Sequence, residues 1–454
     1  MGKAIQDYNA LYSALRPLVQ FGTRCHYFGH VIKGRENVPT DGGYIYAPCH
    51  QQALMEPLIV LHLLREKPVF LARADIFAKP ILRKFFTFLR ILPVYRIRDG
   101  RDSLNKNTEI FEKSRNVILD GYPLCLMAEG RHNNRHQLLP LVKGMFRIAG
   151  ETQLKMGQKP LYIIPTGLDY DEYERPYANV VVNLGKPIPV QDYIQTYQDN
   201  EPLALNQMRQ ALSDSLKGLM HHIASQEHYD EFLTLCKFEN KDYRKARNLK
   251  NNTWNRFCMR QAIAHDLDAL EAAAKAENAT EEDKKRLQEK LDKAHKLQQL
   301  ARKKGLPESV VAERWSAGKL ILSILALALL IGICVTFPPA SAIALLCLML
   351  YPIPFLPTHL IAKKLIKDTQ FRSSVNFGIR MVLSLLYMLT TSFVMGFTQG
   401  AWFGTLLQEH LHFAMPGIFW GVGTFFFTFA LIRITAPAVT WVRGTWDNIK
   451  MLVR

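Results

Sequence analysis

Two residues six positions apart, His50 and Glu56, could together activate a hydroxyl group. An apolar run at 44–47 precedes His50 and a helical pattern follows it, so the histidine is expected where a strand meets a helix. An imidazole can take the proton, and a carboxylate can fix its tautomer and stabilise its charge. Taken alone, this stretch is better explained by a helix cap and a solvated charge. The chemical interpretation therefore depends on the rest of the chain.

Other apolar runs in the same half of the chain also end in turns with polar or basic residues. The residues at or near these ends are Arg96, Glu129, Gly130, Arg131, Lys143 and Pro165. A glycine lets the backbone approach a ligand closely, and an arginine offers a bidentate fork suited to phosphate. Considered by itself, each of these sequences is explained equally well by an ordinary surface turn.

Strand-like and helical patterns alternate over residues 34–190. The apolar runs lie at 44–47, 69–72, 124–128, 161–165 and 180–184, and helical patterns lie near 51–65, 76–90, 103–120 and 140–157. Such alternation predicts an α/β domain with a largely parallel sheet flanked by helices. Since the carboxyl ends of parallel strands share one edge, the turns after these runs are expected to meet there.

In their order and spacing, these stretches resemble the motif blocks of the glycerolipid phosphate acyltransferase superfamily. The resemblance covers roughly residues 34–190 and implies that family's mixed, mainly parallel sheet. His50 matches the histidine of the family's catalytic His-x4-Asp motif. The blocks that bind glycerol phosphate are matched by Arg96, Glu129, Gly130 and Arg131, although Glu-Gly-Arg lacks the family's intervening residue. Pro165 matches the block that closes the acyl pocket, and Lys143 is a possible further site residue.

One position departs from the superfamily pattern. The motif expects an aspartate at position 55, where this chain has Met55, and the nearest acid is Glu56, followed by Pro57. The fungal-type glycerol-3-phosphate acyltransferases look similar, with the acid displaced by one position. Residues 367–378 also resemble a cytoplasmic loop of that subgroup. We therefore expect Glu56 to take the place of the aspartate.

The resemblance implies O-acyl transfer in phospholipid biosynthesis. The donor would be acyl-CoA or acyl-carrier protein, the acceptor a hydroxyl of glycerol-3-phosphate or 1-acylglycerol-3-phosphate, and no cofactor is implied. His50 would be the general base, without a covalent intermediate. A nucleophilic Cys49 is disfavoured because it lacks an independent base. Two alternatives remain: an acyltransferase for another lysolipid or an aminolipid, and a non-catalytic phospholipid-binding scaffold or transporter.

The charge and the cysteines limit the partners. The net charge is +17, which suits a polyanion, and long apolar segments favour membrane lipid and phosphorylated substrates over nucleic acid. The seven cysteines are scattered and form no CxxC pair, so neither a disulfide framework nor a zinc site is expected. His132 and His136 have helical spacing, but the sequence offers no convincing carboxylate ligand beside them, so no metal is expected there either.

Four parts of the chain are expected. These are an amphipathic, interfacial segment at 1–33, an acyltransferase domain at 34–250, a charged helical hairpin at 251–310 and an α-helical membrane domain at 311–454. For the first part, an ordinary helix packed on the domain is an equal alternative. In the hairpin, Thr280 and Asp283 have the spacing of a capping box that starts the second helix.

The last part contains four apolar runs, at 320–337, 340–356, 378–397 and 413–432. Lys and Arg flank the ends of this part and fill the 361–377 loop, whereas the other two turns contain neither. By the positive-inside rule, two hairpins should keep both ends and this loop cytoplasmic. We expect an integral membrane protein with its catalytic domain on the cytoplasmic side, in the cell inner membrane if the source is a bacterium. Prolines leave open whether the hairpins span or re-enter the membrane.

Overall fold

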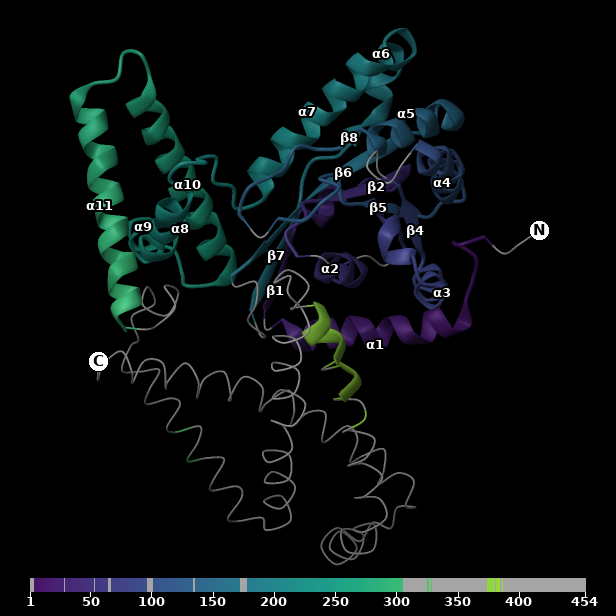
Figure 1. Cartoon of the computed structure of the whole chain (residues 1–454), viewed down its shortest axis with the longest axis horizontal. Helices are drawn as coiled ribbons and strands as arrows, with labels where there is room; N and C mark the ends of the chain where they lie inside the picture. The colour runs from purple at the N-terminus through teal and green to yellow at the C-terminus, as the bar shows by residue number, and fades with distance from the viewer. Residues whose placement is uncertain are drawn as a thin grey trace, which may run out of the picture. The chain divides into compact units, whose positions relative to one another are not determined.

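A sheet of eight strands forms the centre of the described part of the protein (Figure 1). The computed structural model describes residues 4–304 except 28, 53, 64–66, 96–100, 134 and 172–177; beyond 304 it describes only 325, 328, 374–379, 381–383 and 386. The strands are β1 Gly29–Lys33, β2 Gly43–Pro48, β3 Val69–Arg73, β4 Ile91–Val94, β5 Leu124–Leu126, β6 Leu161–Tyr170, β7 Asn179–Leu184 and β8 Ile188–Pro189. Their order is β1-β7-β6-β2-β5-β3-β4, and β8 pairs with β6.

The pairing is mixed and mainly parallel, as the sequence predicts. β2 runs parallel to both β5 and β6, so that Ile45 lies opposite Leu124 on one side and Ile163 on the other. Antiparallel pairs occur between β6 and β7 and between β6 and β8. The parallel strands β2, β5, β3 and β4 therefore present their carboxyl ends at one edge of the sheet.

Helices cover both faces of this sheet (Figure 1). The helices are α1 Ala10–His26, α2 Met55–Leu63, α3 Pro80–Phe88, α4 Arg101–Leu119, α5 Gly144–Met156, α6 Ile194–Asp199, α7 Glu201–Leu219, α8 Tyr229–Phe238, α9 Asn240–Ala246, α10 Thr253–Lys275 and α11 Glu281–Lys304. The elements up to α10 and most of α11 belong to one compact unit, Met1–Gln298.

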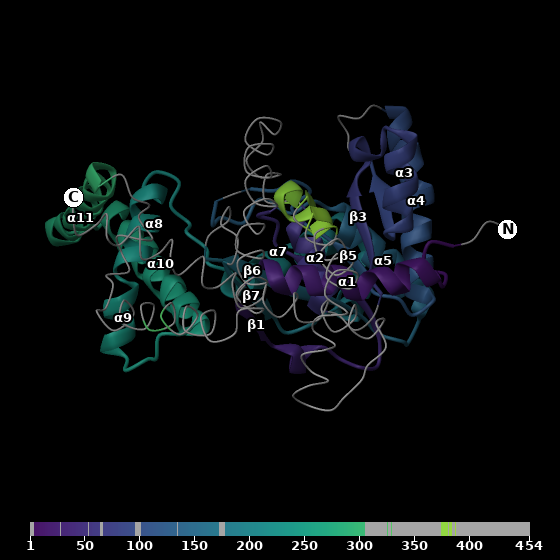
Figure 2. The ribbon, with the colours of Figure 1, turned by 90° about the horizontal axis from the view of Figure 1, so that it is seen from below.

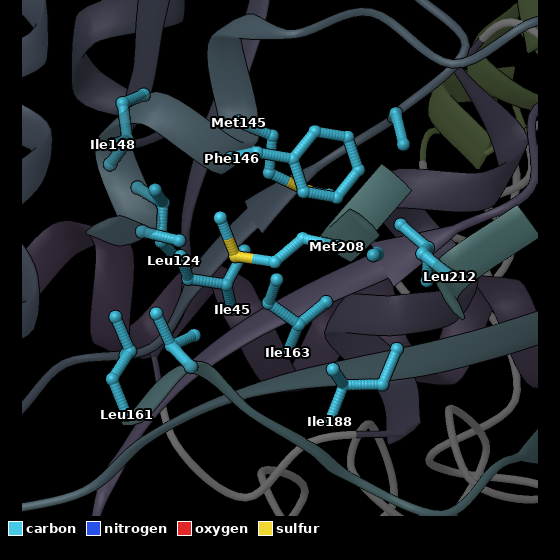
Figure 3. Packing of buried hydrophobic residues seen from close by; sticks show 14 of the residues in the cluster. Ile45, Leu124, Met145, Phe146, Ile148, Leu161, Ile163, Ile188, Met208 and Leu212 are labelled. Carbon is cyan, nitrogen blue, oxygen red and sulfur yellow. The ribbon is translucent and has the colours of Figure 1, made fainter. Parts of the chain in front are cut away.

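The core lies between the sheet and the helices α4, α5 and α7. Figure 3 shows Ile45 and Ile163 of neighbouring strands facing Met145 of α5 and Met208 of α7. All four of these side chains are fully buried. Burial of an aliphatic side chain of this size contributes about 1.5–3 kcal/mol, so this contact fixes the strands that carry the candidate site residues.

β6 extends further than the sequence predicts. The apolar run at 161–165 suggests a strand that ends in a proline turn, yet β6 continues to Tyr170. Pro165 lies between the segment that pairs with β8 and the segment that pairs with β7, where its missing N–H interrupts neither antiparallel pairing. Its carbonyl oxygen accepts a hydrogen bond from the Gly185 N–H at 2.9 Å. The proline is therefore a buried junction within a strand.

Helix α1 packs on α2 of the same unit. Asn9 caps it by accepting a hydrogen bond from the Tyr12 N–H, and the Gln20 side chain donates to the carbonyl oxygen of Leu61 at 2.9 Å. Tyr12 is buried, whereas Leu11 is 68% exposed. These contacts belong to a helix packed on the domain. Its placement in a membrane interface stays a prediction.

The charged stretch after α9 forms the helices α10 and α11. The side-chain oxygen of Thr280 accepts from the Asp283 N–H at 3.1 Å, and the Asp283 carboxylate accepts from the Thr280 N–H at 3.2 Å, so the predicted capping box is confirmed. Leu267 and Leu291 belong to the apolar cluster that packs this hairpin against α8. Most of the membrane domain predicted at 311–454, including nearly all of its apolar runs, lies outside the described residues. Among the helices that the structure does describe, none has the length and apolar character needed to span a bilayer.

Candidate active site

His50 and Glu129 meet at the carboxyl edge of the parallel strands. β2 ends at Pro48, two residues before His50, and β5 ends at Leu126, three residues before Glu129. Because β2 and β5 are adjacent and parallel, both turns leave the sheet on the same side. The backbone N–H of His50 donates to Glu129 Oε1 at 2.6 Å.

Glu56 binds the His50 ring directly. Its Oε2 lies 2.5 Å from His50 Nδ1. Glu56 is the second residue of α2 and is completely buried, whereas the His50 side chain is 14% exposed. When Nδ1–H donates to this carboxylate, Nε2 becomes the nitrogen that can accept a proton from another molecule. The structure thus brings together the two residues that the sequence proposes as a pair.

The second oxygen of Glu56 holds the turn before α2. Oε1 accepts from the backbone N–H groups of Gln51 at 2.6 Å and Gln52 at 2.5 Å. Burial raises the pKa of Glu56 above its ordinary value, and the neighbouring His50 together with these hydrogen bonds opposes that rise. The carboxylate therefore fixes both the ring and the backbone of the histidine turn.

Glu129 is turned into the protein. It is 4% exposed, and its Oε2 accepts from the Leu139 N–H at 2.8 Å, while Oε1 holds the His50 N–H. Burial raises its pKa to about 7, against the effect of these two hydrogen bonds. Both oxygens thus join backbone segments. The sequence motif places this glutamate among the phosphate-binding residues, whereas its contacts in the structure are those of a residue that positions the His50 turn.

The turn after Glu129 returns to His50. Gly130 has a φ of +65°, and a Cβ atom there would lie 3.0 Å from the Val142 side chain. The Asn133 N–H donates to the carbonyl oxygen of His50 at 3.0 Å, and the His132 ring lies edge-to-face with the His50 ring at 5.4 Å between centroids. His132 is not among the site residues predicted from the sequence. Its position directly after Glu-Gly-Arg was the signal for it.

One protein-family model matches the part of the chain that contains this geometry. Residues 30–169 match the family model described as Acyltransferase. This part of the chain is therefore similar to that family. Among solved structures, the 1-acyl-sn-glycerophosphate (LPA) acyltransferase PlsC from Thermotoga maritima is similar at 20% identity, with a TM-score of 0.32, over 45% of this chain and 79% of that one. A comparison with curated proteins found no match.

The remaining predicted residues of the acyltransferase domain occupy different environments. Arg131 is exposed in the turn after Glu129, and Lys143 is exposed directly before α5. Pro165 is buried in β6, opposite Ala47 of β2. Arg96 lies outside the described residues. The domain therefore presents two cationic side chains, Arg131 and Lys143, to solvent along the segment that contains the Glu-Gly-Arg turn.

Cys49 links the end of β2 to β6. Its Sγ accepts from the Leu168 N–H at 3.1 Å and lies 3.4 Å from the Leu168 carbonyl oxygen. The thiol is fully buried, and burial raises its pKa well above the ordinary value. A buried, neutral thiol is a poor nucleophile, which agrees with the sequence-based argument against covalent catalysis at this residue.

A buried polar cluster lies beyond the His50 turn. His136, Asp169 and His221 offer ligand atoms within 4.8 Å of one another. However, the Arg260 guanidinium donates to Asp169 and, at 3.0 Å, to Asp171, so a cation already neutralises the carboxylate. Burial opposes ionisation of Asp169, but Arg260 and His136 hold its pKa below the ordinary value. We infer that this cluster holds residues 131–143 against α10.

A second group of residues with metal-ligand spacing lies at α10 and the loop before α8. A lysine side chain binds to it. Glu227, His228 and Glu271 have ligand atoms within 4.8 Å of one another. The Lys275 ammonium donates to Glu227 at 2.9 Å and to Glu271 at 2.6 Å. This arrangement is a surface ion pair joining α10 to the loop before α8.

Proposed function

We propose that the chain transfers a fatty acyl group from a thioester donor to a hydroxyl group of glycerol-3-phosphate or 1-acylglycerol-3-phosphate. The observation that carries this proposal is the contact of 2.5 Å between His50 Nδ1 and Glu56 Oε2, inside a domain that matches the Acyltransferase family model. Such a pair provides a base for a hydroxyl without requiring a nucleophile from the protein. The donor would be acyl-CoA or acyl-carrier protein, and the proposal includes no cofactor.

The reaction would proceed in two stages at His50. Nε2 takes the proton from the acceptor hydroxyl as its oxygen forms a bond to the thioester carbonyl carbon. The tetrahedral intermediate then collapses, the carbon–sulfur bond breaks, and the leaving thiolate receives the proton from the imidazolium. Glu56 keeps the ring oriented and stabilises its positive charge in between.

The acceptor phosphate would be held by basic side chains. Arg131 offers a bidentate fork on the exposed turn after Glu129, and Lys143 adds a second exposed charge on the same segment. Arg96, from the sequence motif, would complete this set. Gly130 would let the backbone approach the acceptor, Glu129 would position the His50 turn, and Pro165 would support the acyl pocket.

We further assign the chain to the fungal-type glycerol-3-phosphate acyltransferase subgroup, which favours glycerol-3-phosphate as the acceptor. The displaced acid at Glu56 followed by Pro57 supports this assignment, as does the sequence of residues 367–378. The apolar runs in residues 311–454 support an integral membrane protein with its acyltransferase domain on the cytoplasmic side.

A panel of acceptors tests the proposal. Purified full-length protein in detergent is given labelled acyl-CoA or acyl-carrier protein, together with glycerol-3-phosphate, 1-acylglycerol-3-phosphate, other lysolipids or an aminolipid. We expect labelled product with one of the two glycerol phosphates and none with a His50→Ala variant. Product only with another lysolipid or an aminolipid would favour the alternative acceptor class. Lipid binding without any transfer would favour the scaffold.

A further inference from the structure

Helix α3 exposes large apolar side chains. Ile81 is 80% exposed, Phe85 50% and Leu82 37%, and within the described helix no residue is buried. Residues 81 and 85 are four positions apart and share one face of the helix, with residue 82 beside them. An apolar group of this kind on the surface of a domain marks an interaction site.

Exposed cations border the apolar residues. Lys79, Arg83 and Lys84 are all exposed, and the sequence from 79 to 90 contains no Asp or Glu. We call residues 79 and 81–85 the α3 surface. The adjacent helix α1 also exposes apolar groups near its beginning, since Tyr8 is 66% and Leu11 68% exposed. The combination of an apolar centre and a cationic border is typical of helices that lie in a membrane interface.

Aromatic contacts hold the other side of α3 on the domain. The Phe86 ring lies 5.2 Å from the Phe77 ring between centroids, and the Phe88 ring lies edge-to-face with Tyr12 of α1 at 6.3 Å. Arg90, directly after the helix, is buried and lies over the Tyr12 ring at 5.1 Å. These contacts fix the helix with its 81–85 side outward. Figure 2 shows α3 at the edge of the domain.

We propose that the α3 surface docks on an anionic lipid membrane. The apolar side chains would enter the boundary between headgroups and acyl chains, and the cations would meet lipid phosphates. This docking goes beyond the proposed acyl transfer, and it can be measured without any turnover.

Charge favours lipid over a second copy of this chain. In a two-fold symmetric contact of α3 with α3, the cations at 79, 83 and 84 would face the same cations of the partner copy. The helix has no carboxylate to compensate them. An anionic bilayer supplies the opposite charge and an apolar interior at the same place.

The position of α3 also brings the candidate active site to this membrane. β3 runs parallel to β5, so it ends on the same edge of the sheet as the turns of His50 and Glu129. The 3-10 helix Ala74–Phe77 leads directly from that edge to α3. Docking through the α3 surface would therefore place the carboxyl edge of the sheet close to lipid.

Site-specific photocrosslinking tests this proposal in the full chain. p-Benzoylphenylalanine is encoded at position 81 or, as a matched control, at position 203, because Leu203 on α7 is also an exposed apolar residue at 47%. The protein is reconstituted in vesicles of phosphatidylcholine with or without phosphatidylglycerol. We expect lipid adducts to be roughly tenfold more abundant at position 81 than at 203, and more abundant with the anionic lipid.

The charge is tested by a Lys79→Gln, Arg83→Gln, Lys84→Gln variant that also carries the photocrosslinker at position 81. Since all three side chains are exposed, folding should be unaffected, and circular dichroism checks it. The lipid adducts should fall several-fold in anionic vesicles. Equal lipid adducts at 81 and 203, no response to phosphatidylglycerol, or crosslinks from 81 to a second copy of the chain would each overturn the proposal. None of these readouts depends on acyl transfer, so they are separate from the test of the proposed function.

Discussion

Glu56 reaches His50 although it stands one position later than the acid of the His-x4-Asp motif. The longer side chain starts from the second residue of α2, and its Oε2 lies 2.5 Å from His50 Nδ1. Residue order thus predicted that His50 and Glu56 form a pair, and the structure adds how the pair is held, through Gln51, Gln52 and Glu129. Those contacts were not predictable because they involve backbone N–H groups, which carry no sequence signal.

Loss of the Glu56 charge should impair turnover. Glu56→Gln keeps the size of the side chain but removes the charge that stabilises the imidazolium and selects the tautomer, so we expect kcat to fall by roughly 10²–10⁴-fold. Steady-state rates with labelled acyl donor give the value, and circular dichroism checks the fold. An unchanged kcat would mean that another acid orients His50.

Glu129 should make stability depend on pH. Its pKa is about 7 in the folded protein, against 4.5 as the ordinary value, so between these values the folded state binds more protons than the unfolded state. The free energy of unfolding should therefore decrease as pH rises from 4.5 to 7, by about 3 kcal/mol from this group. Urea titrations of the wild type and Glu129→Gln test this. The difference between the two proteins should change with pH in that direction, and a constant difference would contradict it.

At the scale of elements, apolar runs predicted several strands of the sheet. Runs at 44–47, 69–72 and 180–184 correspond to β2, β3 and β7. β1 was missed because Gly29–Lys33 is short and mixes polar with apolar residues, and its assignment depends on pairing with β7. β8 is only two residues long and is recognisable only through its pairing with β6.

The turn after β5 offers a test with a matched control. Gly130 and Gly121 both have positive φ, at 65° and 82°, but only at Gly130 would a Cβ meet a neighbour, Val142 at 3.0 Å. Alanine should cost about 1–2 kcal/mol of stability at either position because of φ. Only Gly130→Ala should also lower acyl transfer, since it displaces Glu129 and Arg131. Comparable activity loss in Gly121→Ala would show that the effect is general destabilisation.

At the scale of the whole molecule, charge and hydropathy predicted a membrane partner. The net charge of +17 and the apolar runs beyond residue 319 carry that prediction, while the exposed α3 surface became visible only with the fold. A short helix such as Pro80–Phe88 has the same sequence pattern whether it is buried or exposed. The difference lies in which side packs on the sheet, and that depends on residues distant in sequence.

The 361–377 loop should lie on the cytoplasmic side. Its Lys and Arg residues resist translocation and are attracted to anionic lipid. A cysteine introduced as Thr369→Cys, in a cysteine-depleted background, should resist an impermeant thiol reagent in intact cells and react after the membrane is opened. Labelling in intact cells would place the loop outside and separate it from the acyltransferase domain.

We expect His50 to take the proton of the acceptor hydroxyl. The rate of acyl transfer to the acceptor that the panel identifies tests this, with purified full-length wild type, His50→Ala and, as a matched control, His265→Ala, whose histidine side chain is 85% exposed. We predict that His50→Ala loses roughly 10²–10⁴-fold in rate while its fold is retained, and that His265→Ala is unchanged. Turnover of a folded His50→Ala variant near the wild-type rate would contradict the role of His50 as the general base.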